Sequence, residues 1–107
     1  MDTWDLATLD VEARQPVVLS SHSEARAVAI ALPAGEALQD HQVHERAWLA
    51  VVQGEIEVEH DGETVRGGAG FLAGWAPGER HEVRAVEDAR LLLLLTPWPG
   101  EGHPSNR

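Results

Sequence analysis

Short apolar stretches separated by turn residues occupy the middle of the chain and predict strands. Residues 55–60 (EIEVEH) alternate strictly, with Ile56 and Val58 on one face and glutamates on the other, which is typical of a half-buried strand. Residues 47–53 (AWLAVVQ) are apolar on both faces, as expected of a strand covered on both sides. Asp61-Gly62 is a favoured two-residue hairpin turn, because both positions accept a positive φ.

Further strands are expected where short apolar runs lie between Gly, Pro and acidic residues. These segments are residues 26–32, 64–66, 71–73, 81–86 and 89–96. The last of them (ARLLLLLT) is leucine-rich and favours a helix by composition, but it is short, follows an acidic turn and ends at a proline, so a strand is expected. Seven or eight short strands predict an all-β sandwich or closed barrel with little helix.

The chain of 107 residues is the size of one domain. Composition divides it into an N-terminal arm (residues 1–16), a strand-rich barrel (residues 17–96) and a Pro- and Gly-rich tail (residues 97–107). The first ten residues are acidic and carry no apolar run, so no signal peptide is expected. The longest apolar run, residues 91–95, is far shorter than the roughly 20 residues of a membrane helix.

The charge balance narrows the classes of partner. Eighteen acidic against eight basic residues give a formal net charge of −10. Nucleic-acid binders carry a basic stripe, which is missing here, and anionic membranes are disfavoured for the same reason. The chain contains no cysteine, which excludes disulfides and thiolate metal sites. A cytoplasmic protein without nucleic-acid or membrane partners is predicted.

Two motifs of glycine and histidine resemble those of the cupins, and both occur in order. The first cupin motif runs Gly, five residues, His, one residue, His, three or four residues, Glu, six residues, Gly. Residues 35–54 read GEALQDHQVHERAWLAVVQG, in which Gly35, His41 and Gly54 match. Val43 stands in place of the second His, and Ala47 in place of the Glu.

The second cupin motif runs Gly, five residues, Pro, one residue, Gly, two residues, His, three residues, Asn. Residues 70–85 read GFLAGWAPGERHEVRA, in which Gly70, Gly78 and His81 match. Pro77 is displaced by one position and Ala85 replaces the Asn. The resemblance implies a small single-domain cupin, an all-β double-stranded barrel of the jelly-roll type around one internal pocket.

The resemblance also implies a divalent metal held by histidines and a carboxylate at the barrel mouth. Only His41 and His81 stand at ligand positions of the two cupin motifs, whereas three protein ligands are usual for a catalytic metal. Such a ligand set does not distinguish Zn, Fe, Ni, Mn and Cu. The alternative is a pocket without metal, in which the two histidines serve as hydrogen-bonding groups.

Two neighbouring residues are candidates to complete the metal site. His44 follows His41 by three residues, so on a regular strand it faces the other way and turns inward only through a bulge or loop. Glu45 has the parity of His41 and can supply a carboxylate. The alternatives are a surface histidine at position 44, and at position 45 a solvated carboxylate paired with a nearby arginine.

Alternation also identifies candidate ligand-binding residues. Leu49, Val51 and Gln53 share one parity and are expected to line the pocket, with Trp75 near its mouth. Ring nitrogens of His41 and His81 are expected about 3–4 Å apart, since metal–nitrogen bonds are near 2 Å. The remaining histidines, at positions 22, 60 and 103, are expected on the surface, and Trp48 is expected in the core.

Two functions follow from the resemblance, and the sequence leaves the choice open. The first is a barrel that binds a small organic molecule, with a metal in its pocket. The alternative is a metal-dependent enzyme of the dioxygenase, isomerase or decarboxylase type. A homodimer through residues 17–32 is expected, because a bare edge strand invites pairing with a second copy.

Overall fold

The computed structural model describes residues 1–13, 15–22, 24–41 and 44–99, the side chains of residues 22 and 39–41 excepted. Within these residues the chain forms nine strands and no helix. They are β1 (Val17–His22), β2 (Ala25–Leu32), β3 (Ala37–His41), β4 (Arg46–Gln53), β5 (Glu55–His60), β6 (Glu63–Gly68), β7 (Leu72–Trp75), β8 (His81–Ala85) and β9 (Ala89–Thr96). This part of the chain has no helix whose length and apolar character would let it span a membrane.

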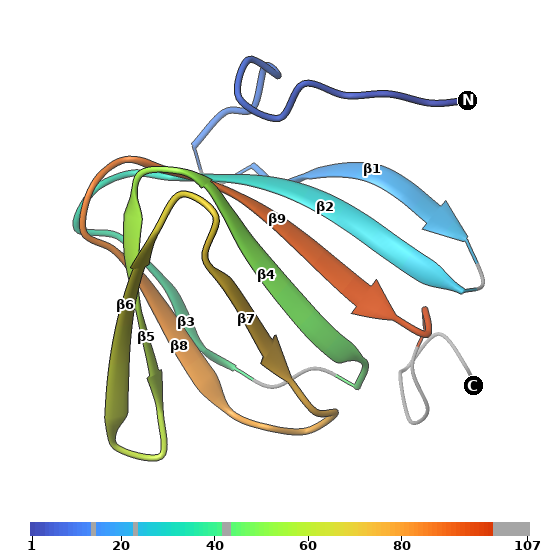
Figure 1. The fold of residues 1–107 in the computed structure, drawn as a ribbon. Coiled ribbons are helices and arrows are strands. Elements are labelled where there is room, and N and C mark those ends of the chain that lie inside the picture. Colours follow the sequence, from blue (N-terminus) through green and yellow to red (C-terminus); the bar gives the residue numbers. More distant parts are fainter. Residues whose placement is uncertain (14, 23, 42–43, 100–107) are drawn as a thin grey trace.

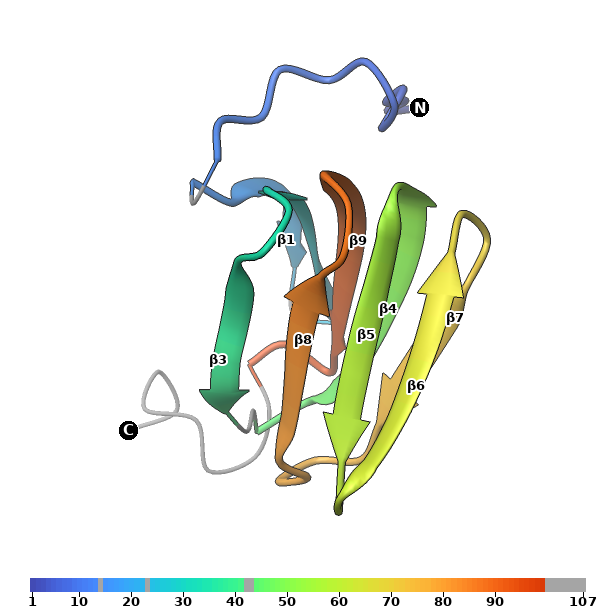
Figure 2. The same cartoon turned by 90° about the vertical axis from the view of Figure 1, so that its left-hand side faces the viewer.

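The strands form two antiparallel sheets that face each other (Figure 1). The five-stranded sheet has the order β1-β2-β9-β4-β7, and the four-stranded sheet the order β3-β8-β5-β6. Figure 2 shows β3, β8, β5 and β6 side by side in front of the other sheet. The expected all-β jelly roll is therefore confirmed.

The core lies between the sheets and follows the alternation along each strand. In β4 the inward positions Ala47, Leu49 and Val51 are buried, and Ile56 and Val58 of β5 meet them from the other sheet. Trp48 lies on the outer face of β4 with 37% of its surface exposed, so its assignment to the core is wrong. Its ring packs over Gly74, where a Cβ would come within 2.8 Å of it.

The turns before and after β5 contain residues with positive φ angles. Asp61 and Gly62 have φ values of 51° and 77°, and His60 pairs with Glu63 across them, which confirms the two-residue hairpin. Gly54 between β4 and β5 has a φ of 83°, and an added Cβ would lie 2.2 Å from the carbonyl oxygen of Asp88. Both the backbone conformation and this close approach require glycine at position 54.

Two strands were not predicted. β1 (Val17–His22) pairs with β2 at the edge of the larger sheet, and β3 (Ala37–His41) pairs with β8 at the edge of the smaller one. His41 is the last residue of β3. The register of each pairing shifts once, which interrupts the alternation that would reveal these strands in the sequence.

Candidate functional site

Four strand ends meet at one end of the sandwich, the lower end in Figure 2. β3 ends there at His41 and β8 begins there at His81. β4 begins at Arg46 at this end, and β7 ends at Trp75 opposite Ala47. The two motif histidines are therefore brought to one mouth of the barrel by strands of the same sheet.

His81 is a buried histidine with a fixed ring. Only 4% of its surface is exposed, and it continues the inward face of Val83 and Ala85 along β8. Its ring stacks on that of Trp75, with centroids 3.9 Å apart and an interplanar angle of 11°. The Nδ1 atom lies 3.3 Å from the carbonyl oxygen of Glu79. A carbonyl only accepts, so Nδ1 is the donor in this contact.

His41 is the direct partner of His81 in the register between β3 and β8. Side chains of directly opposed residues in an antiparallel pair lie on one face of the sheet, with Cβ atoms about 4.5–5.5 Å apart. The register shift between Leu38 and His41 brings about this pairing. The side chain of His41 lies outside the described residues, so the expected distance between the two rings stays a prediction.

Glu45 is the second buried polar residue of the mouth, and only 1% of its surface is exposed. It directly precedes β4 and has the inward parity of Ala47 and Leu49, both of which are buried. Its alternative assignment as a solvated carboxylate is therefore wrong. Buried carboxylates are retained where partners or a metal compensate for the water they lose.

The other predicted site residues occupy different environments. His44 is exposed, whereas Leu49 and Val51 are packed in the core. Gln53 was expected inward, but it is exposed because the pairing of β4 with β9 shifts its register between Val51 and Gln53. Trp75 is 5% exposed and forms the wall behind His81.

His60, which was expected to be a plain surface residue, fastens the loop between β7 and β8. Its Nδ1 donates to the carbonyl oxygen of Arg80 at 2.8 Å, and its Nε2 lies 3.1 Å from Oε2 of Glu79 and 3.3 Å from Oδ2 of Asp61. Oε1 of Glu79 accepts from the backbone N–H of Ala76 at 2.8 Å. Because both ring nitrogens face oxygen acceptors, only the imidazolium donates to both.

The surroundings of His60 raise the pKa of its imidazole. The hydrogen bond to the Arg80 carbonyl is the largest effect and raises the pKa of His60 above 6.5. Desolvation opposes it, and the carboxylates of Asp61, Glu79 and Glu63 each raise the pKa by a smaller amount. The sequence carried a signal for this residue, because His60 has the inward parity of Ile56 and Val58 in β5.

A cleft of about 280 Å³ opens between the β5–β6 hairpin and β7, beside the mouth. It is lined by Val58, His60, Glu63, Val65, Phe71, Ala73, Gly74, Trp75 and Glu79. Trp75 thus borders both this cleft and the ring of His81. Among the described side chains, which do not include that of His41, no three His, Asp or Glu groups are arranged to hold a metal.

Comparison with known proteins gives a family and a fold. The sequence profile described as "Cupin domain" matches residues 28–97. A search of curated proteins gives no match. Among solved structures, an uncharacterized conserved protein with a double-stranded β-helix domain from Klebsiella pneumoniae superposes with a TM-score of 0.80 at 17% identity, covering 94% of this chain and 93% of that one.

Two further solved structures are similar over most of their length. An RmlC-like cupin protein from Desulfovibrio desulfuricans has a TM-score of 0.79 at 22% identity, covering 91% of this chain and 97% of that one. The structure of KdgF from a Halomonas species has a TM-score of 0.72 at 28% identity, covering 83% of this chain and 85% of that one. The likeness to the first of these, as to the Klebsiella protein, shows the fold alone.

Proposed function

The chain belongs to the cupin family, and we propose that it is a small-molecule-binding barrel that holds a divalent transition metal at its mouth. The observation that carries the proposal is the pairing of His41 with His81 at the mouth, where His81 is buried and its ring is fixed by Trp75. Two imidazoles and one carboxylate suit Zn, Fe, Ni, Mn or Cu.

The proposed ligands are His41, His81 and Glu45. Glu45 stands in for the carboxylate that the cupin motif has at the position of Ala47, since it is buried and directly precedes β4, the strand that contains Ala47. A bound metal would supply Lewis-acid polarisation of an oxygen of the small molecule. The protein contributes the orientation of the His81 ring through its stack on Trp75 and its contact with the carbonyl of Glu79.

The enzyme alternative uses the same residues. Three protein ligands leave coordination positions for a substrate, which is the arrangement of catalytic metal sites. The burial of Glu45 favours this alternative over a two-histidine site, because it offers a third ligand. Turnover of a small molecule by the metal-loaded protein, lost in His81→Ala, would distinguish the enzyme from the binding barrel.

Calorimetric titration of chelator-treated, untagged protein with Ni²⁺ and Zn²⁺ tests the metal proposal. We expect one site per chain, with affinity reduced at least about tenfold in Glu45→Gln and more in His81→Ala. His44→Ala is the matched control, because His44 is exposed at the same loop and its loss should leave the affinity unchanged. Equal affinities in wild type and His81→Ala would contradict the assignment.

We further propose a homodimer that uses the edge of the larger sheet. β1 is an edge strand of the larger sheet, and Val18 on it is 47% exposed. Sedimentation at micromolar concentration should show two chains for the wild type and one for Val18→Lys. A single chain for the wild type would contradict this proposal without affecting the metal site.

A further inference from the structure

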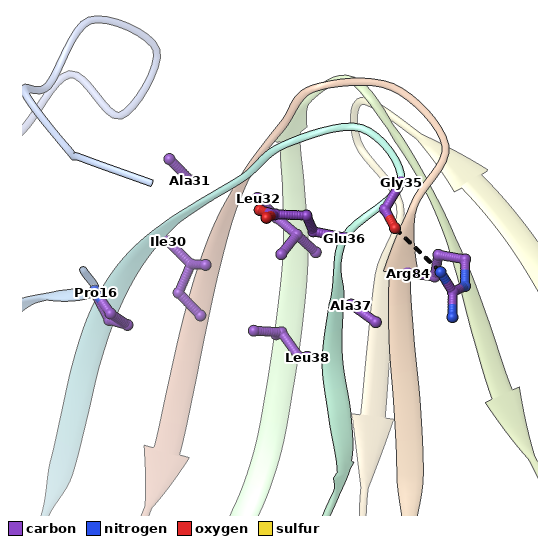
Figure 3. A pocket seen from close by; sticks show the side chains of 9 residues that line it. All are labelled: Pro16, Ile30, Ala31, Leu32, Gly35, Glu36, Ala37, Leu38 and Arg84. Carbon is purple, nitrogen blue, oxygen red and sulfur yellow. Dashed lines mark hydrogen bonds between the residues drawn. The ribbon is translucent and has the colours of Figure 1, made fainter. Parts of the chain in front are cut away.

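The two ends of β8 are fastened by different chemistry. At the end away from the mouth, the N–H of Gly35 donates to the carbonyl of Ala85 at 2.9 Å. Nη1 of Arg84 donates to the carbonyl of Gly35 at 3.1 Å, and Figure 3 marks this bond with a dashed line. Because an arginine keeps its charge in proteins, these contacts are not expected to change with pH.

At the mouth, β8 follows a short turn that is held together through Glu79. The N–H of Glu79 donates to the carbonyl of Ala76 at 3.2 Å, and Oε1 of Glu79 accepts from the N–H of Ala76 at 2.8 Å. The carbonyl oxygen of Glu79 lies 3.3 Å from Nδ1 of His81, whose ring is stacked on Trp75. Glu79 therefore connects the closure of this turn with the position of the His81 ring.

His60 ties the same turn to the β5–β6 hairpin. Its Nδ1 lies 2.8 Å from the carbonyl oxygen of Arg80, and its Nε2 lies 3.1 Å from Oε2 of Glu79. Glu79 thus uses one carboxylate oxygen within its own turn and the other for His60. A neutral imidazole has one N–H and donates to only one of these acceptors, whereas the imidazolium donates to both. Both bonds between hairpin and turn are therefore present only when His60 is protonated.

The charged groups around His60 belong to the hairpin, to the turn and to β8. Asp61 in the hairpin lies 3.3 Å from Nε2, but its side chain is 89% exposed, so water screens this pair strongly. Glu63 on β6 is paired with His60 across the hairpin. The other charged neighbours are Glu59, Glu79, Arg80 and Glu82. The bond to the Arg80 carbonyl, and less strongly three of these carboxylates, raise the pKa of His60 above 6.5, so the imidazolium persists to a higher pH than in a free histidine.

We propose that His60 and Glu79 form a proton-controlled latch that positions the ring of His81 at the mouth. With His60 protonated, the turn is held against the hairpin, and the carbonyl of Glu79 stays in contact with Nδ1 of His81. Without that proton, His60 keeps its bond to the Arg80 carbonyl, the Nε2 lone pair faces the Glu79 carboxylate, and the turn loosens. Only the consequence, a weaker metal site at high pH, rests on the proposed function.

Backbone NMR of the metal-free protein from about pH 5 to 9 tests the latch itself. The amide proton of Ala76 contacts the Glu79 carboxylate, so its chemical shift should change with an inflection at the pKa measured on the His60 resonances. Glu79→Gln keeps an oxygen for this amide but removes the charge, so its Ala76 shift should be flat. A flat Ala76 shift in the wild type would overturn the latch. An inflection of equal size in Glu79→Gln would show only the through-space charge of His60 and would also overturn it.

Asp61→Asn is the matched control, because Asp61 faces the same nitrogen of His60 but is not part of the turn. The pKa of His60 should fall in this variant, since a neighbouring carboxylate is lost. The inflection of the Ala76 shift should move with it and keep its size. Loss of the inflection in Asp61→Asn would contradict the assignment of the latch to Glu79.

Calorimetric titration with Ni²⁺ at several pH values tests the consequence for the metal site. The affinity of the wild type should exceed that of Glu79→Gln at least about fivefold near pH 6, and the ratio should fall to about one near pH 9, where His60 is neutral in both proteins. Protonation of the metal ligands cancels in this ratio. A ratio that stays constant with pH would show a purely structural role for Glu79 and overturn the latch. A wild type that binds no Ni²⁺ would contradict the proposed metal site, while the Ala76 shifts would still decide on the latch.

Discussion

Replacing Trp75 removes the face on which the ring of His81 lies, and a double-mutant cycle isolates that contact. Both residues are at most 5% exposed, and their rings are nearly parallel at a centroid distance of 3.9 Å. Stacked aromatic pairs contribute about 0.5–1.5 kcal/mol beyond their burial. We therefore expect a coupling free energy near 1 kcal/mol between Trp75→Leu and His81→Leu.

The single variant Trp75→Leu should lose more unfolding free energy than the coupling free energy alone, since the smaller side chain also leaves a cavity. Truncation of a buried Trp to Ala costs about 3–5 kcal/mol, and Leu keeps part of the volume, so about 2–3 kcal/mol is expected. For a domain of this size that corresponds to a fall in Tm of about 10–20 °C.

Urea denaturation of the wild type, both single variants and the double variant measures the cycle. A chelator and a pH near 8 keep the proteins metal-free and most imidazoles neutral. The control cycle combines Trp48→Leu with His81→Leu, because Trp48 lies on the outer face of β4. The coupling free energy of this control should stay within about 0.3–0.5 kcal/mol of zero. A Trp75–His81 coupling no larger than this control would refute the role assigned to the stack.

Two more predictions concern the mouth and a turn. The raised pKa of His60 stabilises the fold fully below a pH of about 6.5, and this contribution disappears as the pH rises through the folded pKa. In urea titrations, the difference in unfolding free energy between the wild type and His60→Gln should therefore shrink between about pH 6 and 9. A difference that grows with pH would contradict this prediction. Gly54→Ala should lower the unfolding free energy by at least about 1–2 kcal/mol, since alanine meets both a positive φ and the Asp88 carbonyl, and an unchanged Tm would show that this turn relaxes freely.

The sequence predicted those elements whose chemistry is local. The strict alternation of residues 55–60 matches the bounds of β5, and the Asp61-Gly62 hairpin follows from the two positions that accept a positive φ. Residues 89–96 form a strand despite their leucines, because β9 pairs with β2 along one edge and with β4 along the other. β1 and β3 were missed because a register shift breaks the period in each of them.

The site could be predicted only as far as parity and motif spacing reach. His81 falls at its motif position and is buried on the inward face of β8. Glu45 was singled out by its parity with His41, and it is buried directly before β4. The prediction that Gln53 faces inward was wrong, because one register shift in a strand reverses the face of every residue beyond it. The attachment of His60 to Glu79 and Arg80 depends on a loop twenty residues away, a contact that periodicity does not report.

The most direct test of the proposed function is elemental analysis of untagged protein purified without chelators and after exposure to zinc, iron, nickel, copper and manganese. The pairing of His41 with His81 beside the buried Glu45 predicts close to one transition-metal ion per chain. The same measurement on His41→Ala and His81→Ala should give almost none, while His44→Ala keeps the wild-type content. Wild-type protein that stays metal-free under all these conditions would contradict the metal site.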